Sequence, residues 1–182
     1  IDKTLIALAH NGTLVNTATL YAICAEHGVQ LRASTDSEIA AKIIGEVTKV
    51  SHSLREGLKQ AMNLMRGAYA MVLASPDALY AFRDPNGIRP LVIGKLPHER
   101  GWVVSSETCG LDIVGAEFVR EVAPGEVVRF NADGMVAEQG IPPRARASCV
   151  FEYVYFARPD SDIDGISVHR ARENMGKLLA KA

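Results

Sequence analysis

The chain has 182 residues, of which 48% are hydrophobic and 23% are charged, a balance typical of one substantial globular domain or of one domain with the start of a second. A formal net charge of −1 provides no excess of positive charge to attract a polyanion, so nucleic acid is not expected as a partner. No apolar run approaches the roughly 18 residues that cross a bilayer. Three widely spaced cysteines without a CxxC motif indicate neither a disulfide framework nor a metal site, so we expect a cytoplasmic protein with no membrane partner.

The first third of the chain predicts a short strand followed by three helices. The strand is an apolar run that ends at Asn11-Gly12, a dipeptide typical of a tight turn. The helices have apolar positions at helical spacing, and two of them begin at a capping box of Ser or Thr with Glu three residues later. The predicted elements are a strand over 5–10 and helices over 15–27, from Thr35 and from Ser53.

Between residues 68 and 130 the hydrophobic pattern changes to short runs typical of strands. Turn sequences containing Pro, Asn, Asp or Gly separate these runs at the spacing of an antiparallel sheet. Helices followed by strands indicate an α+β fold rather than a doubly wound parallel sheet. The predicted strands cover 68–74, 79–82, 91–96, 102–105, 118–122 and 126–130.

The C-terminal part predicts a linker and a new unit. Ile141-Pro142-Pro143-Arg144 cannot join a sheet ladder, because its consecutive prolines lack backbone N–H donors. An apolar and aromatic run over 149–156 follows, and Ser167 is placed to cap a final helix. We therefore expect a domain over 1–140, a linker over 141–165 and the start of another domain over 166–182.

Two short segments contain residues suited to chemistry. Asn11 and Gly12 place a side-chain amide beside a backbone N–H, the pair of donors that an oxyanion hole for acyl transfer requires. Asp36 offers an acidic acceptor for an amino group. Both segments have a structural alternative, because Asn-Gly is a common turn dipeptide and an acid in the first turn of a helix favours the helix dipole. Position 1 is Ile1, so no Cys, Ser or Thr stands there to attack a substrate.

The order of six motifs along the chain favours the chemical interpretation. Together they resemble the amidophosphoribosyltransferase family of glutamine-dependent enzymes. The first two motifs are shared by several class II amidotransferases, whereas the motifs that begin at Phe82 and Phe151 are more specific to this family. The resemblance covers essentially the whole chain, through residues 8–12, 34–38, 66–70, 82–91, 105–109 and 151–161.

The resemblance implies a four-layer α-β-β-α sandwich of the N-terminal-nucleophile hydrolase type, followed by a phosphoribosyltransferase domain. It implies hydrolysis of glutamine and transfer of the ammonia to phosphoribosyl pyrophosphate, the first committed step of purine biosynthesis. Asn11 and Gly12 match the oxyanion-hole donors, and Asp36, together with His10, matches the part that binds glutamine. The implied partners are glutamine and phosphoribosyl pyrophosphate, in an enzyme expected to be a homo-oligomer.

The family's nucleophilic Cys and the Arg that clamps the glutamine carboxylate lie upstream of the segment that matches Ile1. We therefore expect residues 1–182 to be an inactive fragment. Cys24 lies on the apolar stripe of its helix and is expected to be a core residue rather than a substitute nucleophile. The resemblance implies no cofactor within the fragment, Mg²⁺ in the transferase domain of the parent and, in some members, an iron–sulfur cluster to which Cys149 would contribute one ligand.

Two alternatives remain at the level of sequence. One is the glutaminase domain of another class II amidotransferase, such as a hexosamine-phosphate synthase or asparagine synthetase. The other is a non-catalytic module that uses the same pocket to bind glutamine. Sequence outside residues 1–182 distinguishes them, because a phosphoribosyl-binding loop supports the transferase and a natural start near Ile1 supports the binding module.

Overall fold

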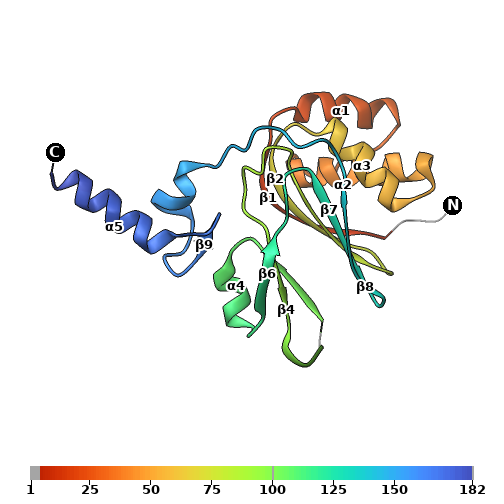
Figure 1. The fold of residues 1–182 in the computed structure, drawn as a ribbon. Helices are drawn as coiled ribbons and strands as arrows, with labels where there is room; N and C mark the ends of the chain where they lie inside the picture. Colours follow the sequence, from red (N-terminus) through yellow and green to blue (C-terminus); the bar gives the residue numbers. More distant parts are fainter. Residues whose placement is uncertain (1–4, 100, 182) are drawn as a thin grey trace.

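The computed structural model describes residues 5–99 and 101–181 (Figure 1). Its main helices and strands are, in chain order, β1 (Ala7–Leu14), α1 (Thr17–Glu26), α2 (Asp36–Ser51), α3 (Leu54–Leu64), β2 (Gly67–Ala74), β3 (Leu79–Arg83), β4 (Val92–Lys95), β5 (Trp102–Ser105), α4 (Thr108–Ile113), β6 (Glu117–Glu121), β7 (Glu126–Asn131), β8 (Gly134–Gln139), β9 (Asp162–Ile163), β10 (Ile166–Ser167) and α5 (Val168–Leu179). No helix in this part of the chain is both long enough and apolar enough to span a membrane.

Two antiparallel sheets form the centre of the molecule. The larger sheet has the strand order β1-β2-β3-β7-β8, and the smaller sheet has the order β5-β4-β6. Helices α1, α2 and α3 cover the larger sheet, whereas α4 packs on the smaller sheet (Figure 1). Short turns join β2 to β3, β4 to β5 and β7 to β8, and such short connections require antiparallel pairing, since parallel strands would need long crossover connections.

Successive side chains of the central strands point to opposite faces of their sheet, so they pack into three different cores. In β2, Met71 packs against the helices, whereas Ala70 and Val72 face the smaller sheet. In β4, Ile93 faces the larger sheet and Val92 packs beneath α4. Three stacked cores therefore separate four layers, and the predicted α-β-β-α sandwich is confirmed.

The helix starts predicted at Thr35, Ser53 and Ser167 are confirmed, and each has a capping side chain. The helix predicted over 15–27 is present as α1, which begins at Thr17 without a side-chain cap. The hydroxyls of Thr35 and Ser53 accept hydrogen bonds from the N–H groups of Glu38 and Glu56, at 3.3 Å and 3.4 Å. Ser167 caps α5 in the same way. The first of these caps is the one that places Asp36 at the start of α2.

The turn predicted at Asn11-Gly12 is wrong. Instead of ending near residue 10, β1 continues through this dipeptide to Leu14, paired with β2 along its whole length. Gly12 permits this, because its φ is +147° and a Cβ atom at this position would lie 2.0 Å from the carbonyl oxygen of Ala68. Close approach of two backbones, and not a reversal of the chain, is what requires the glycine.

The chain leaves the sandwich after β8. Residues 142–149 have no regular structure, and a π-helical turn over Glu152–Phe156, the hairpin of β9 and β10, and α5 then form a separate C-terminal part that extends from the sandwich (Figure 1). Its core is small and consists of Ala157, Ile163, Val168 and part of Tyr153. The predicted domain limits of 1–140, 141–165 and 166–182 stay a prediction.

Candidate functional site

One side of the site is the outer edge of β1, which is an edge strand of the larger sheet. The N–H of Val15 donates to the carbonyl oxygen of Arg66 on the β2 side, whereas the N–H of Leu14 donates to Oδ2 of Asp36 at 2.9 Å. Because N–H directions alternate along an antiparallel strand, the N–H of Gly12 points the same way as that of Leu14. The backbone donor of Gly12 therefore lies on the edge where the Asp36 carboxylate lies.

Asn11 directs its side chain to the space between the two sheets. Its Nδ2 donates a hydrogen bond of 3.1 Å to Oγ of Ser106, which directly follows β5. A pocket of about 240 Å³ lies at this point, lined by residues of β1, β2, β5 and the residues beside them. The amide of Asn11 thus faces a space between the sheets while its neighbour Gly12 presents a backbone donor at the strand edge.

His10 faces the helical layer from β1. Its Nδ1 lies 3.2 Å from Oγ of Ser37 and 3.7 Å from Oδ1 of Asp36. Burial lowers the pKa of His10, and the nearby Asp36 carboxylate offsets part of this effect. The imidazole is therefore mainly neutral near pH 7, and it links β1 to the first turn of α2.

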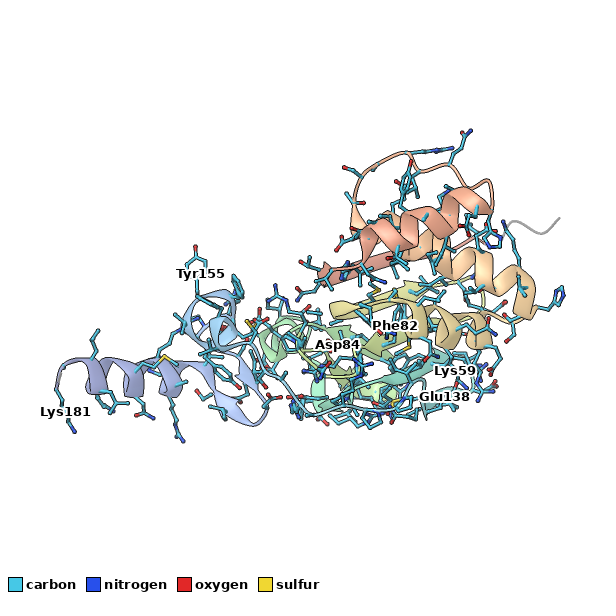
Figure 2. The ribbon with its side chains drawn as sticks, turned by 90° about the horizontal axis from the view of Figure 1, so that it is seen from above. Lys59, Phe82, Asp84, Glu138, Tyr155 and Lys181 are labelled. Carbon is cyan, nitrogen blue, oxygen red and sulfur yellow. The ribbon has the colours of Figure 1, made fainter. Side chains whose placement is uncertain are left out.

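Two buried charged residues, Arg83 and Asp84, organise the loop between β3 and β4. Figure 2 shows Asp84 near Phe82 of β3, well inside the molecule. Burial raises the pKa of the Asp84 carboxyl, although three backbone N–H donors oppose this, and burial lowers the pKa of Arg83. The Asp84 carboxylate accepts from the N–H groups of Tyr69, Asn86 and Ile88, and Arg83 donates to Glu121 and to the carbonyl oxygens of Gly87, Arg89 and Val122.

The same loop contacts the C-terminal part through Arg89. Its Nη1 lies 2.5 Å from Oε1 of Glu152, and its guanidinium lies 4.9 Å from the centre of the Phe156 ring. The positive charge of Arg89 also contributes to the lowered pKa of His10. The motifs that begin at Phe82 and Phe151 therefore meet in space beside the site.

The sequence and the fold agree with those of known glutamine amidotransferases. Residues 2–112 match the family described as the glutamine amidotransferase domain. The chain belongs to this family. It is 42% identical over 177 residues to the amidophosphoribosyltransferase of Bacillus subtilis (strain 168), and 44% identical over 178 residues to that of Synechococcus elongatus. Each alignment covers 97% of this chain and 36% of the relative, so the chain spans about a third of the length of these relatives.

Solved structures give the same result. A glutamine phosphoribosylpyrophosphate amidotransferase from B. subtilis, complexed with ADP and GMP, matches with a TM-score of 0.90 and 42% identity over 100% of this chain and 39% of that chain. A glutamine aminotransferase class-II domain protein from Silicibacter pomeroyi matches at 18% identity with a TM-score of 0.55, over 75% of this chain and 67% of that chain, and shares the fold. The predicted family resemblance is confirmed.

The predicted site residues fall into two groups in this glutamine amidotransferase domain. Gly12, His10 and Asp36 lie together at the edge of β1 and the start of α2, whereas the Asn11 side chain faces the pocket between the sheets. Sequence reasoning missed Ser106, because no local spacing connects this residue of the 105–109 motif to Asn11. The catalytic and binding roles of the four predicted residues stay predictions.

The cysteines lie in three separate environments. Cys24 is buried in the core between the helices and the larger sheet, where burial raises the pKa of its thiol. Cys109 is buried in α4, and Cys149 is partly exposed just before the C-terminal π-helical turn. Within residues 5–99 and 101–181, no three His, Cys, Asp or Glu side chains stand together so that they could hold a metal ion.

Proposed function

We propose that this chain forms the glutamine-binding part of the glutaminase site of an amidophosphoribosyltransferase. The observation that carries this proposal is the arrangement along β1, where the Gly12 N–H and the Asp36 carboxylate share one strand edge and Asn11 is adjacent. The N–H groups of Gly12 and Leu14 are about 7 Å apart, because an extended strand rises about 3.4 Å per residue. This distance is comparable to the length of a glutamine molecule, which can place its amide at Gly12 and its amino group at Asp36.

The chemistry of each residue fits this placement. Attack on the side-chain carbonyl of glutamine develops negative charge on its oxygen, and the Gly12 N–H and the Asn11 amide are the donors that would stabilise it. The Asp36 carboxylate would pair with the α-ammonium group, which a glutamine inside a peptide lacks. Neutral His10 would hold this carboxylate close to β1 without adding a competing positive charge.

We propose that the whole enzyme transfers the released ammonia to phosphoribosyl pyrophosphate. The nitrogen would form a bond to C1 of the ribose as pyrophosphate leaves, giving phosphoribosylamine for purine biosynthesis. The names of the relatives support this reaction, and so does a solved protein described as the allosteric regulatory enzyme of purine biosynthesis, which matches 99% of this chain with a TM-score of 0.90. We also propose that purified residues 1–182 alone do not hydrolyse glutamine, and glutamate release by this chain would contradict that statement.

Two inorganic groups would belong to the parent enzyme. Mg²⁺ would serve phosphoribosyl transfer, and no residue of this chain is assigned to it. For an iron–sulfur cluster the described donor set is insufficient, because Cys24 and Cys109 are buried in separate cores and only Cys149 is partly exposed. We therefore propose that Cys149 supplies one cluster ligand at most, and the proposed hydrolysis of glutamine does not involve this residue.

The test uses two variants of an enzyme that contains this chain. Asn11→Ala should lower kcat for glutamine hydrolysis by about 100- to 1,000-fold with little change in KM, as is typical when an oxyanion donor is removed. Asp36→Asn should instead raise KM for glutamine, because it removes the partner of the α-ammonium group.

Phosphoribosylamine formation from added ammonia is the control, since it bypasses glutamine. Both variants should retain this activity if they fold. Unchanged glutamine hydrolysis in both variants would contradict the proposed site. Glutamine binding by the unaltered enzyme without any hydrolysis would instead favour a non-catalytic binding module.

A further inference from the structure

We propose that Ser106 is a positioning residue for glutamine hydrolysis, because its hydroxyl fixes the Asn11 amide so that the second N–H of that amide stays available to the oxyanion. This inference rests on the proposed function of Asn11. It adds a residue from the smaller sheet to a site whose other members lie on β1 and α2.

The proposal rests on the geometry of the Asn11 side-chain amide. Asn11 Nδ2 has two N–H groups, and one of them donates to Oγ of Ser106 at 3.1 Å. Because the amide group is planar, fixing the direction of one N–H also fixes the direction of the other. The terminal torsion of an Asn side chain is otherwise only weakly restricted. Loss of the Ser106 hydroxyl would therefore let the amide rotate away from its productive orientation.

Ser106 is itself held in place from both sides. The hydroxyl of the preceding Ser105 accepts a hydrogen bond from the N–H of Glu107 at 3.3 Å. The Glu107 carboxylate in turn accepts from the N–H of Arg158 at 2.8 Å and from the hydroxyl of Ser161 at 2.7 Å. The hydroxyl thus reaches Asn11 from a supported loop, which is the arrangement that precise positioning requires.

Because Asn11 and Ser106 meet between the two sheets, positioning of the Asn11 amide has to be distinguished from simple packing of one sheet on the other. Asn11 and Ser106 line the same pocket of about 240 Å³, so their contact crosses the space between the two sheets. A hydroxyl that merely joined the sheets would affect stability but not the rate of the chemical step. A hydroxyl that occupied the oxyanion position would inhibit, and its removal would raise kcat.

The experiment measures glutamine hydrolysis in an active enzyme that contains this chain. Ser106→Ala should lower kcat by about 10-fold, less than the about 100-fold or greater loss that follows outright removal of an oxyanion donor. KM for glutamine should stay within about twofold, because the interaction acts mainly in the transition state. Ser106→Thr keeps the oxygen and should restore kcat to within about threefold of the unaltered enzyme.

Two further variants make the result specific. In an enzyme that already carries Asn11→Ala, adding Ser106→Ala should change kcat by less than about twofold, because residues that act through one another are not additive. Ser75→Ala is the control, since its hydroxyl bonds to Ala78 in the turn that follows β2 and this change should leave kcat unchanged. If Ser106→Ala does not fold, Ser106→Cys preserves the volume while replacing the oxygen with a weak acceptor, and the same loss of kcat is expected.

The outcomes separate this inference from the proposed function. An unaltered enzyme without glutaminase activity, or an Asn11→Ala variant with full activity, would overturn the proposed function. An Asn11→Ala variant that loses activity while Ser106→Ala retains or raises kcat would overturn the role of Ser106 alone. Independent, multiplicative losses in the double variant would also overturn it.

Discussion

Gly12 lets β1 lie against β2 at a place where a side chain would collide with its neighbours. A Cβ atom at this position would lie 2.0 Å from the Ala68 carbonyl oxygen and 2.9 Å from Nε2 of His10. The same residue supplies the N–H that points to the outer edge of the strand. One glycine thus serves both the sheet and the proposed oxyanion site, which explains why a dipeptide typical of turns occurs inside a strand.

Gly12→Ala is therefore expected to lower the free energy of unfolding by about 2 kcal/mol or more, because it combines a strained φ with a backbone collision. Gly45→Ala is the matched control. Gly45 lies in α2, and in the described part of the chain no atom outside this helix lies within 4 Å of an added Cβ, so this change should raise stability by about 0.5–1 kcal/mol through helix propensity. Urea denaturation measures both changes, and equal stability of the Gly12→Ala variant and the unaltered protein would contradict the first.

His10 makes stability depend on pH in a definite direction. Its pKa is lowered in the folded protein by burial, despite Asp36, and Arg89 lowers it further. The unfolded chain therefore binds a proton before the folded protein does as pH falls below about 6.5, the ordinary histidine pKa. Neutral His10 therefore contributes stability at pH values above the ordinary histidine pKa. This contribution is lost as the pH falls from about 6.5 toward the lower pKa that His10 has in the folded protein.

His10→Gln should accordingly reduce the loss of unfolding free energy between about pH 7.5 and about pH 5.5. Denaturant titrations at the two pH values give this difference directly. His27→Gln, at an exposed histidine after α1, is the control and should reduce the loss less than His10→Gln does. If His10→Gln leaves the pH dependence intact, the buried imidazole does not account for it.

At the scale of elements, local sequence signals such as capping residues predict most boundaries of the helices and strands, but they do not predict the contacts between distant segments. Thr35, Ser53 and Ser167 mark helix starts within four residues of sequence, so they can be recognised without knowledge of the fold. β8 escaped prediction because it is an edge strand with few core side chains, and pairing with β7 determines it. The contact of Asn11 with Ser106 could not be predicted either, because only the stacking of the two sheets brings these residues together.

Glu107 connects α4 with the C-terminal part, and its loss should loosen that connection. Its carboxylate accepts from the Arg158 N–H and from Ser161, whose side chain is buried. Glu107→Ala should speed amide hydrogen exchange over residues 158–163 by about 10-fold, which corresponds to roughly 1.4 kcal/mol of local stability. Mass spectrometry of the exchanged peptides measures this effect.

Glu117→Ala provides the comparison, because Glu117 is an exposed residue on β6 and should leave exchange over residues 158–163 unchanged. Faster exchange throughout the molecule in Glu107→Ala would indicate global destabilisation. Unchanged exchange over 158–163 would show that other contacts hold this segment.

At the scale of the whole molecule, the sandwich and the C-terminal part are stabilised in different ways. The three cores of the sandwich contain residues up to Ile141 and none beyond it among the described residues. The C-terminal part has its own small core and projects from the sandwich, with Tyr155 and Lys181 far from the paired Lys59 and Glu138 (Figure 2). The contacts between the two parts are mainly polar and include Arg89 with Glu152, Glu107 with Ser161, Thr108 with Asp162, and Glu121 with Asp164.

This difference predicts where the chain can be shortened. Ending it at Ile141 removes mainly polar contacts from the sandwich, so cooperative thermal unfolding should persist with a Tm within about 5 °C of the full chain, equivalent to roughly 1–2 kcal/mol. Ending it at Asn131 removes β8, its pairing with β7 and the buried Ile141, and also Glu138, one of the two carboxylates that pair with Lys59 on α3. The shorter chain should therefore unfold at a Tm lower by about 10 °C or more, because burial of apolar side chains stabilises far more than exposed ion pairs do. Circular dichroism and calorimetry compare the two, and loss of cooperative unfolding in the chain ending at Ile141 would place the limit of the sandwich domain beyond residue 141.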